Sequence, residues 1–287
     1  MRNLNYQLKL LCRQNRDGSY STQSKRAHHL MQIADQLHAL GFHGMNAGSL
    51  KPKHVDSLVK QWLAQELSTG TIKNRMAVLR WWAQKVDKRN VVARSNDHYG
   101  IPDRQFVTNN SKAKALPASD LEKIPDPYVR LSLELQQAFG LRREEAIKFR
   151  PGFADRGDHI LLKASWTKGG KERTVPIRNA EQQALLDRIR RQVGNGSLIP
   201  ADRSYVQQLR VYERLTANAG LSRMHGLRHA YAQQRYQELT GWLSPAARGP
   251  ISRQLSPEQR QLDQQARLTI THELGHARIQ IVSVYLN

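Results

Sequence analysis

Cysteine is almost absent from the 287-residue chain, in which Cys12 is the only one. A single thiol cannot form an intrachain disulfide, and it cannot build a cysteine cluster around a metal ion. Long apolar runs are also missing, because polar residues interrupt every uncharged stretch. The sequence therefore contains no recognisable signal segment or membrane span, and we expect a cytoplasmic protein with no membrane partner.

Acidic residues are scarce relative to basic ones. The chain has 24 Asp and Glu against 45 Lys and Arg, which gives a net charge of +21. The excess occurs throughout, with 16 basic and 5 acidic residues up to residue 95 and 29 against 19 after it. Nucleic acid phosphate is the partner that such a charge favours, although a secreted cationic or a ribosome-associated protein would have a similar composition.

The N-terminal third of the chain is predicted to be helical. The spacing is clearest over residues 71–87, where apolar side chains recur every three or four positions and Thr71 is the expected N-cap. The same helix carries Lys73, Arg75 and Arg80, which we expect to contact DNA phosphates. A solvated basic face is the alternative interpretation of these three residues.

Residues 95–117 show no periodicity and are predicted to be a linker between two domains. Helical patterns resume after it, and an amphipathic run over residues 128–139 stops at Gly140. Farther along, Ser256 is predicted to cap a helix, with Pro257 at its first position.

Two β-rich runs, residues 160–166 and 173–177, lie on either side of a Gly-Gly pair. Glycines between two such runs favour a tight turn, so the pattern predicts a β-hairpin. Lys168 and Lys171 flank the glycines and would lie at the tip of this hairpin.

Four separated stretches carry arginine, lysine, histidine and tyrosine at characteristic spacing. Each is weak alone, since a Gly-Leu-Arg turn or a lysine in a hairpin is common in proteins. In chain order they are Gly-Leu-Arg-Arg-Glu-Glu at 140–145, the hairpin Lys168, His-Gly-Leu-Arg-His at 225–229, and Leu-Gly-His at 274–276 with Tyr285 nine residues later.

Together these stretches resemble the catalytic domain of the tyrosine recombinases, the phage integrase family, over residues 118–287. Residues 1–94 resemble, more weakly, the helical SAM-like core-binding domain of that family. The resemblance implies a mainly α fold with a small β-hairpin sheet. It also implies a site-specific DNA recombinase that acts through a 3′-phosphotyrosyl intermediate with no cofactor and no metal, and that integrates or excises a mobile element.

The resemblance assigns catalysis to six residues. A tyrosine nucleophile conserves the bond energy in a covalent link, and two guanidiniums can clamp the charge that develops on the phosphate. Glu145, three residues after Arg142, would support that arginine from the same helical face. Lys171 competes with Lys168 for the role of general acid. The six residues are Arg142, Lys168, His225, Arg228, His276 and Tyr285.

The family also implies partners and a setting. Double-stranded DNA recombination sites are the expected substrate, and a homotetramer on DNA is the expected assembly. Accessory DNA-bending or excision factors are candidate partners. A bacterial, phage or plasmid origin and association with the nucleoid follow from the same resemblance, with dimer resolution as a second possible setting.

Two other functions compete with this interpretation. His272-Glu273-Leu274-Gly275-His276 fits the H-E-x-x-H pattern of zinc metalloproteases, but its extended form would need Gly and His where the chain has Ile279 and Val282. A non-catalytic DNA-binding regulator on the same scaffold is the second alternative, and the full set of six residues argues against it.

The chain departs from compact members of the family in two places. The interval from Arg228 to His276 is longer, and the excess, about residues 240–268, is expected to form a surface helix and loop. Only Leu286 and Asn287 follow Tyr285, so we expect the apolar residues of 279–284 to anchor the tyrosine and assembly on DNA to order it. The sequence leaves open whether Tyr285 acts in its own subunit or in a neighbour.

Overall fold

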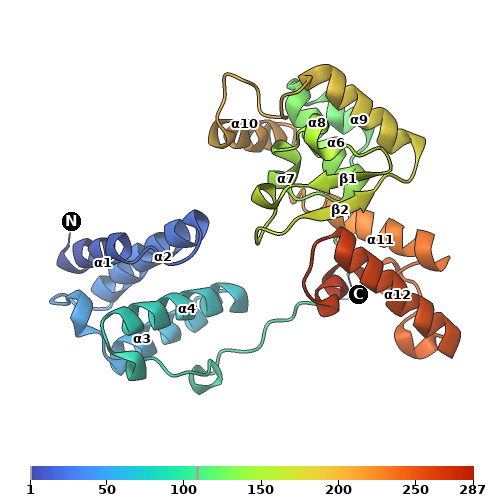
Figure 1. The fold of residues 1–287 in the computed structure, drawn as a ribbon. Coiled ribbons are helices and arrows are strands. Elements are labelled where there is room, and N and C mark those ends of the chain that lie inside the picture. Colours follow the sequence, from blue (N-terminus) through green and yellow to red (C-terminus); the bar gives the residue numbers. More distant parts are fainter. Residues whose placement is uncertain (1, 108–109) are drawn as a thin grey trace. The chain divides into compact units, whose positions relative to one another are not determined.

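A computed structural model describes residues 2–107 and 110–287, and the chain divides into two compact units, Met1–Gln105 and Phe106–Asn287 (Figure 1). Both units are mainly helical, and the described residues contain a single sheet of two strands. The predicted fold class is therefore confirmed. No helix in the described ranges is long and apolar enough to cross a membrane.

The first unit packs its helices around a core that contains Trp62 and Trp82. Its last long helix begins earlier than expected, because the Ser68 side chain accepts a hydrogen bond from the Thr71 N–H (3.2 Å) and caps the helix. The prediction of Thr71 as the N-cap was wrong by three residues. The elements are α1 (Asn3–Gln14), α2 (Tyr20–Ala39), α3 (Pro52–Ala64), α4 (Thr69–Lys85) and the 3₁₀ turns η1 (Ala47–Ser49), η2 (Arg89–Val91) and η3 (Asp97–Tyr99).

The second unit surrounds its hairpin with helices, of which α11 packs against α6, α12 and α13, and α12 also packs against β2 (Figure 1). Its helices are α5 (Ala118–Glu122), α6 (Pro127–Phe139), α7 (Arg143–Ile147), α8 (Pro151–Ala154), α9 (Ala180–Val193), α10 (Tyr205–Asn218), α11 (Gly226–Thr240), α12 (Pro257–Glu273) and α13 (Ser283–Leu286). The strands are β1 (His159–Leu162) and β2 (Arg173–Pro176), and the 3₁₀ turns are η4 (Ala164–Trp166), η5 (Pro245–Ala247), η6 (Ser252–Gln254) and η7 (Ile279–Val282).

The predicted hairpin is present, but its first strand is shorter than the sequence indicated. β1 ends at Leu162, and the rest of the run forms η4. The strands are antiparallel, with Ile160 opposite Val175 and Leu162 opposite Arg173. All four of these side chains are buried, so alternation along the strands turns Arg173 inward together with three apolar residues.

The predicted start of α12 is confirmed. Ser256 accepts from the Gln259 N–H (3.3 Å), and the Gln259 side chain accepts from the Ser256 N–H (2.9 Å). The long interval before it forms η5, η6 and the loops between them. Ser244, Ala246 and Leu255 of this interval are buried, so it does not lie wholly on the surface.

Residues of the predicted linker take part in both cores. Ile101 is buried in the first unit, and Leu116 is buried in the second. The boundary between the units, after Gln105, lies inside the predicted linker. Each unit thus extends beyond the helices that periodicity detects, because irregular chain can bury single apolar residues without producing a repeating pattern.

Candidate active site

The turn between α6 and α7 places Arg142. Gly140 ends α6 with a φ of +61°, and a Cβ there would lie 2.6 Å from Cδ1 of Tyr231, so only glycine fits. Arg142 then caps α7, and the Glu145 carboxylate accepts from its backbone N–H (2.7 Å) and from Nη1 (2.8 Å). Arg142 is thereby held at the start of the helix with its side chain partly exposed.

Glu145 also pairs with Arg173, a residue that the sequence patterns did not single out. Nη1 and Nη2 of Arg173 donate to the two carboxylate oxygens at 2.8 and 2.7 Å, and both side chains are buried. Burial raises the pKa of Glu145, but the hydrogen bonds and charge of Arg173, with Arg228 and Arg142, outweigh it and hold the pKa at about 2. The only signal in the sequence was one charged residue on the apolar face of β2, which indicates a buried charge but does not identify its partner.

Arg228 lies near the start of α11 and is almost completely buried, with 1% of its surface exposed. Its two terminal nitrogens donate to the main-chain carbonyls of Gly140 and Leu274. Burial, and next the charge of Arg142, lower the pKa of Arg228 to about 10, which leaves it protonated at neutral pH. A guanidinium has five N–H donors, so others remain available to a phosphate oxygen.

Tyr285 lies on α13 and is 5% exposed. Nε of Arg228 donates to its hydroxyl oxygen at 3.4 Å, and Nε2 of His225 lies 3.4 Å from the same oxygen. Val282 of the preceding turn is buried, and Ile279 packs against the same core. The tyrosine is thus anchored by the expected apolar segment and lies in the site of its own chain.

Three histidines surround the Tyr285 ring, with centroid distances of 4.5 Å to His229, 5.5 Å to His276 and 6.0 Å to His225. Burial is the main cause that lowers their pKa, to about 4 for His229 and His276, and neighbouring cationic residues add to it. All three are therefore neutral at pH 7. Nε2 of His276 is buried and has no hydrogen-bond partner among the described residues, as expected of a group that awaits a ligand.

The hairpin tip borders an open cavity of about 330 Å³ next to these residues. Lys168 and Lys171 both line it, so both lysines can approach a group bound there. The remaining lining residues are Arg142, Thr167, Gly169, Glu172, Arg173, His272, Gly275, His276 and Ala277.

Two family models match most of the chain between them. One is described as the N-terminal domain of phage integrases and matches residues 1–92, and the other is described as integrase and matches residues 104–234. The chain belongs to the phage integrase family of tyrosine recombinases. The matched ranges include Arg142, Lys168, His225 and Arg228, whereas His276 and Tyr285 lie beyond them.

Solved structures show the same integrase fold. An integrase of the Tn1549 transposon in complex with circular intermediate DNA is 16% identical with a TM-score of 0.58, and the match covers 100% of this chain and 96% of that one. XerH recombinase bound to a difH substrate is 19% identical (TM-score 0.57; 99% and 81% covered), and a lambda integrase dimer bound to a core site is 15% identical (0.62; 99% and 77%). No curated protein sequence matches the chain.

The H-E-x-x-H stretch of this integrase does not have the geometry of a zinc protease. Such a site needs both histidines on one helix face, but α12 ends at Glu273 and Gly275 follows with a φ of +64°, so His276 lies outside the helix. The Glu273 carboxylate accepts hydrogen bonds from Tyr231 (2.7 Å) and Arg235 (3.0 Å). Within residues 2–107 and 110–287, no cluster of three or more His, Cys, Asp or Glu residues is arranged to hold a metal ion.

Each of the three α4 residues predicted to contact DNA also has a contact within the chain. Lys73 pairs with Asp103 at 2.6 Å, and the Arg75 guanidinium lies over the Trp62 ring at 5.2 Å. Arg80 donates to the Ala93 carbonyl and the Asn96 side chain. Their contact with DNA therefore stays a prediction, and Arg80 has a structural role beside it.

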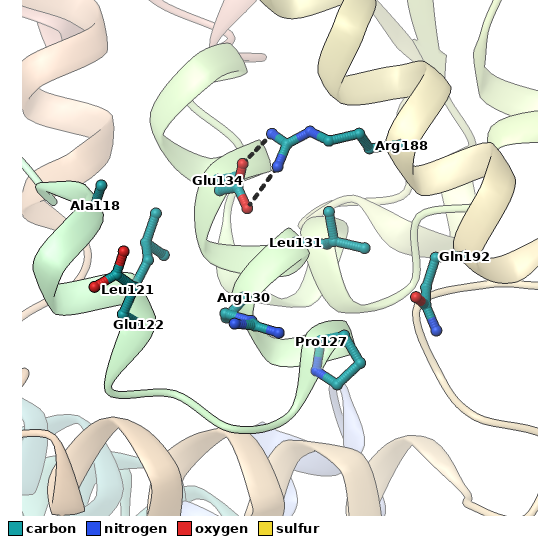
Figure 2. A pocket seen from close by; sticks show the side chains of 9 residues that line it. All are labelled: Ala118, Leu121, Glu122, Pro127, Arg130, Leu131, Glu134, Arg188 and Gln192. Atoms are coloured by element: carbon teal, nitrogen blue, oxygen red, sulfur yellow. Dashed lines mark hydrogen bonds and ion pairs between the residues drawn. The ribbon is translucent and has the colours of Figure 1, made fainter.

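A second cavity, of about 410 Å³, lies in the second unit beside α5, α6 and α9 (Figure 2). Arg188 and Glu134 pair with each other at its edge. Its lining contains no tyrosine, histidine or lysine, so it lacks the groups that phosphoryl transfer requires. The lining residues are Ala118, Leu121, Glu122, Pro127, Arg130, Leu131, Glu134, Arg188 and Gln192.

Proposed function

We propose that this integrase is a site-specific recombinase that cuts and rejoins duplex DNA with Tyr285 as its nucleophile. The observation that carries the proposal is the environment of the Tyr285 hydroxyl, which lies between the buried Arg228 and the neutral His225, with the unpartnered Nε2 of His276 nearby. A tyrosine in that environment is supplied with a cation, a proton acceptor and a place for a phosphate.

Cleavage by Tyr285 requires no water molecule. The Tyr285 oxygen attacks the phosphorus, its proton passes to neutral His225, and the P–O5′ bond breaks. A covalent 3′-phosphotyrosyl link and a free 5′ hydroxyl result, with Lys168 donating the proton to the departing oxygen. Arg142 and Arg228 hold the non-bridging oxygens while their charge increases. Attack by a different 5′ hydroxyl reverses the steps and joins new strands.

Glu145 holds the arginine clamp in position. Its carboxylate bonds both Arg142 and Arg173, so it aligns one guanidinium toward the phosphate while the other ties it to β2. The depressed pKa of about 2 keeps this carboxylate charged throughout the working pH range.

Similar proteins suggest the assembly and setting. A lambda integrase tetramer has been seen on a Holliday junction, and the Tn1549 integrase is a transposon protein. We propose that this chain also acts as a homotetramer on paired DNA sites, in the cytoplasm of a bacterium, for a phage, plasmid or other mobile element. Accessory DNA-bending or excision proteins would then select between integration and excision.

Covalent capture tests the proposal and identifies the target site in the same experiment. Genomic fragments from the source cell are incubated with purified protein in excess EDTA, and DNA that stays attached after denaturation is sequenced. Wild-type protein is expected to retain one family of sites through a phosphotyrosine at Tyr285. Tyr285→Phe should retain none, while its affinity for the captured site stays within about threefold, since one hydroxyl contributes about 0.5–1 kcal/mol.

The same assay distinguishes the alternatives. Specific binding with no covalent product from wild-type protein would indicate a regulator and overturn the proposal. A covalent product that persists in Tyr285→Phe would move the nucleophile to another residue. The metalloprotease interpretation needs a separate incubation with a protein substrate and zinc but without EDTA, and zinc-dependent cleavage there would support it.

A further inference from the structure

Gln233 has no part in the chemistry above, yet it lies against the nucleophile. It is on α11, five residues after Arg228, and is 9% exposed. Its Nε2 donates to the main-chain carbonyl of Tyr285 at 3.0 Å, and its Oε1 accepts from the Ser111 hydroxyl at 3.0 Å. These two hydrogen bonds fix the orientation of the Gln233 amide, because its nitrogen donates to the carbonyl and its oxygen must then face the serine.

The Ser111 end belongs to the segment by which the chain enters the second unit. The same hydroxyl accepts from the Ala113 N–H at 3.2 Å, and the Lys114 N–H donates to the Gly226 carbonyl at 3.0 Å. A Cβ on Gly226 would lie 2.7 Å from the Lys112 carbonyl oxygen, so glycine allows the segment to lie directly on the first turn of α11. That turn follows His225 directly and contains Arg228.

Tyr285, at the other end of this hydrogen-bonded chain, lies on α13, a helix too short to be stable alone. α13 has four residues, and the last four carbonyls of any helix have no partner within it. The amide of Gln233 supplies a buried partner for one of these carbonyls. The contacts of the Tyr285 hydroxyl, at 3.4 Å from both Arg228 and His225, are long enough that a small shift of α13 would break them.

We propose that Gln233 is a positioning residue for Tyr285, and that Ser111 couples the connecting segment to the placement of the nucleophile. This inference rests on the proposed function, in which Tyr285 attacks the phosphate. A displacement of residues 111–114 would be transmitted through two hydrogen bonds to the tyrosine main chain. The path of the chain between the two units would in this way affect the rate of DNA cleavage.

The test uses the captured site as a nicked duplex, in single-turnover cleavage by the full chain. Gln233→Met keeps the length of the side chain but removes both hydrogen bonds, and we expect cleavage to slow about thirtyfold with DNA affinity unchanged, because misplaced reacting groups lose rate rather than binding. Ser111→Ala should slow cleavage about threefold, the effect of one hydrogen bond. Combined with Gln233→Met it should add nothing, since the two residues act through one path.

A matched control is Gln234→Met, because this neighbour is exposed and its amide only reaches Glu238 at 3.2 Å. A readout that does not depend on catalysis is the ¹⁹F resonance of a fluorotyrosine placed at position 285. One sharp line is expected for wild type and Gln234→Met, and a shifted or broadened line for Gln233→Met. Thermal unfolding verifies that each variant is folded.

The results separate the positioning role from the proposed function. If Tyr285→Phe abolishes the covalent product while Gln233→Met cleaves at the wild-type rate with an unchanged ¹⁹F line, the positioning role is overturned and the proposed function stands. If Tyr285→Phe still yields the product, the function itself fails. A Gln233→Met variant that loses rate without any change in the ¹⁹F line would also overturn the inference.

Discussion

The two units differ in what they bury. Among the described residues of the first unit, the buried polar side chains are Asn5 and His54, whereas the second unit buries charged groups such as Glu145, Arg173 and Arg228. Burial of a charge is unfavourable unless it is paired and hydrogen-bonded. The second unit meets that requirement through ion pairs and main-chain carbonyls.

The two units therefore use positive charge in different ways. Surface lysines and arginines of the first unit can contribute to affinity for any phosphate, with little dependence on exact position. Buried arginines of the second unit have fixed positions, which is what stabilisation of a transition state requires. We therefore expect charge changes in the first unit to alter binding, and those in the second to alter rate.

The largest expected effect comes from Arg228→Lys. Lysine keeps the charge but cannot reach both carbonyls and Tyr285 at once, so we expect single-turnover cleavage to fall about a thousandfold with little change in affinity. Arg13→Lys, at an exposed arginine of the first unit, is the matched control and should cleave normally. A loss of cleavage rate below tenfold in Arg228→Lys would contradict the difference proposed between the two units.

The second effect concerns the hairpin lysines. Lys168→Ala should slow cleavage about a hundredfold, the usual contribution of a general acid, and Lys171→Ala much less. A substrate with sulfur in place of the bridging 5′ oxygen needs no proton on departure, so it should restore most of the rate to Lys168→Ala. Rescue of Lys171→Ala instead would assign the proton to that residue.

The third effect is on stability and pH. Glu145→Gln breaks a buried pair and should lower the unfolding free energy of the second unit by about 3 kcal/mol at pH 7. The folded pKa of Glu145, about 2, lies below its ordinary value of 4.5, so its stabilisation is present above pH 4.5 and is lost as the pH falls toward 2. Calorimetry should show the difference between wild type and variant shrinking over that range. A constant difference would contradict the pairing.

The smallest effect is expected in the first unit. Lys73→Gln loses an exposed ion pair with Asp103, so its stability should change by less than about 0.5 kcal/mol. If Lys73 contacts a phosphate, the slope of log affinity against log salt should fall by about 1. Arg80→Gln should lower the unfolding free energy more than Lys73→Gln does and should change the salt slope less, since Arg80 donates hydrogen bonds to Ala93 and Asn96. Equal behaviour of the two variants would remove the distinction drawn for α4.

Local features were predictable because they depend on neighbours within a few residues. The apolar run of α6 ends at Gly140, and the capping box at Ser256 begins α12, as their patterns predicted. The hairpin followed from its glycines, although β1 ended early. The N-cap of α4 was misplaced because Ser68 and Thr71 are both good caps, and one turn of helix separates them.

The sequence by itself determined the helical class and the basic charge, since these depend on composition and periodicity, and its resemblance to the tyrosine recombinases supplied the six candidate residues. Only the tertiary structure decided that Arg173 pairs with Glu145, 28 residues away, and that Gln233 joins Ser111 to Tyr285 across 122 and 52 residues. Contacts over such separations depend on how helices and strands pack, and no repeating pattern within one element encodes them. An inward-facing arginine or a glutamine on a helix has the same local pattern whether or not a partner awaits it.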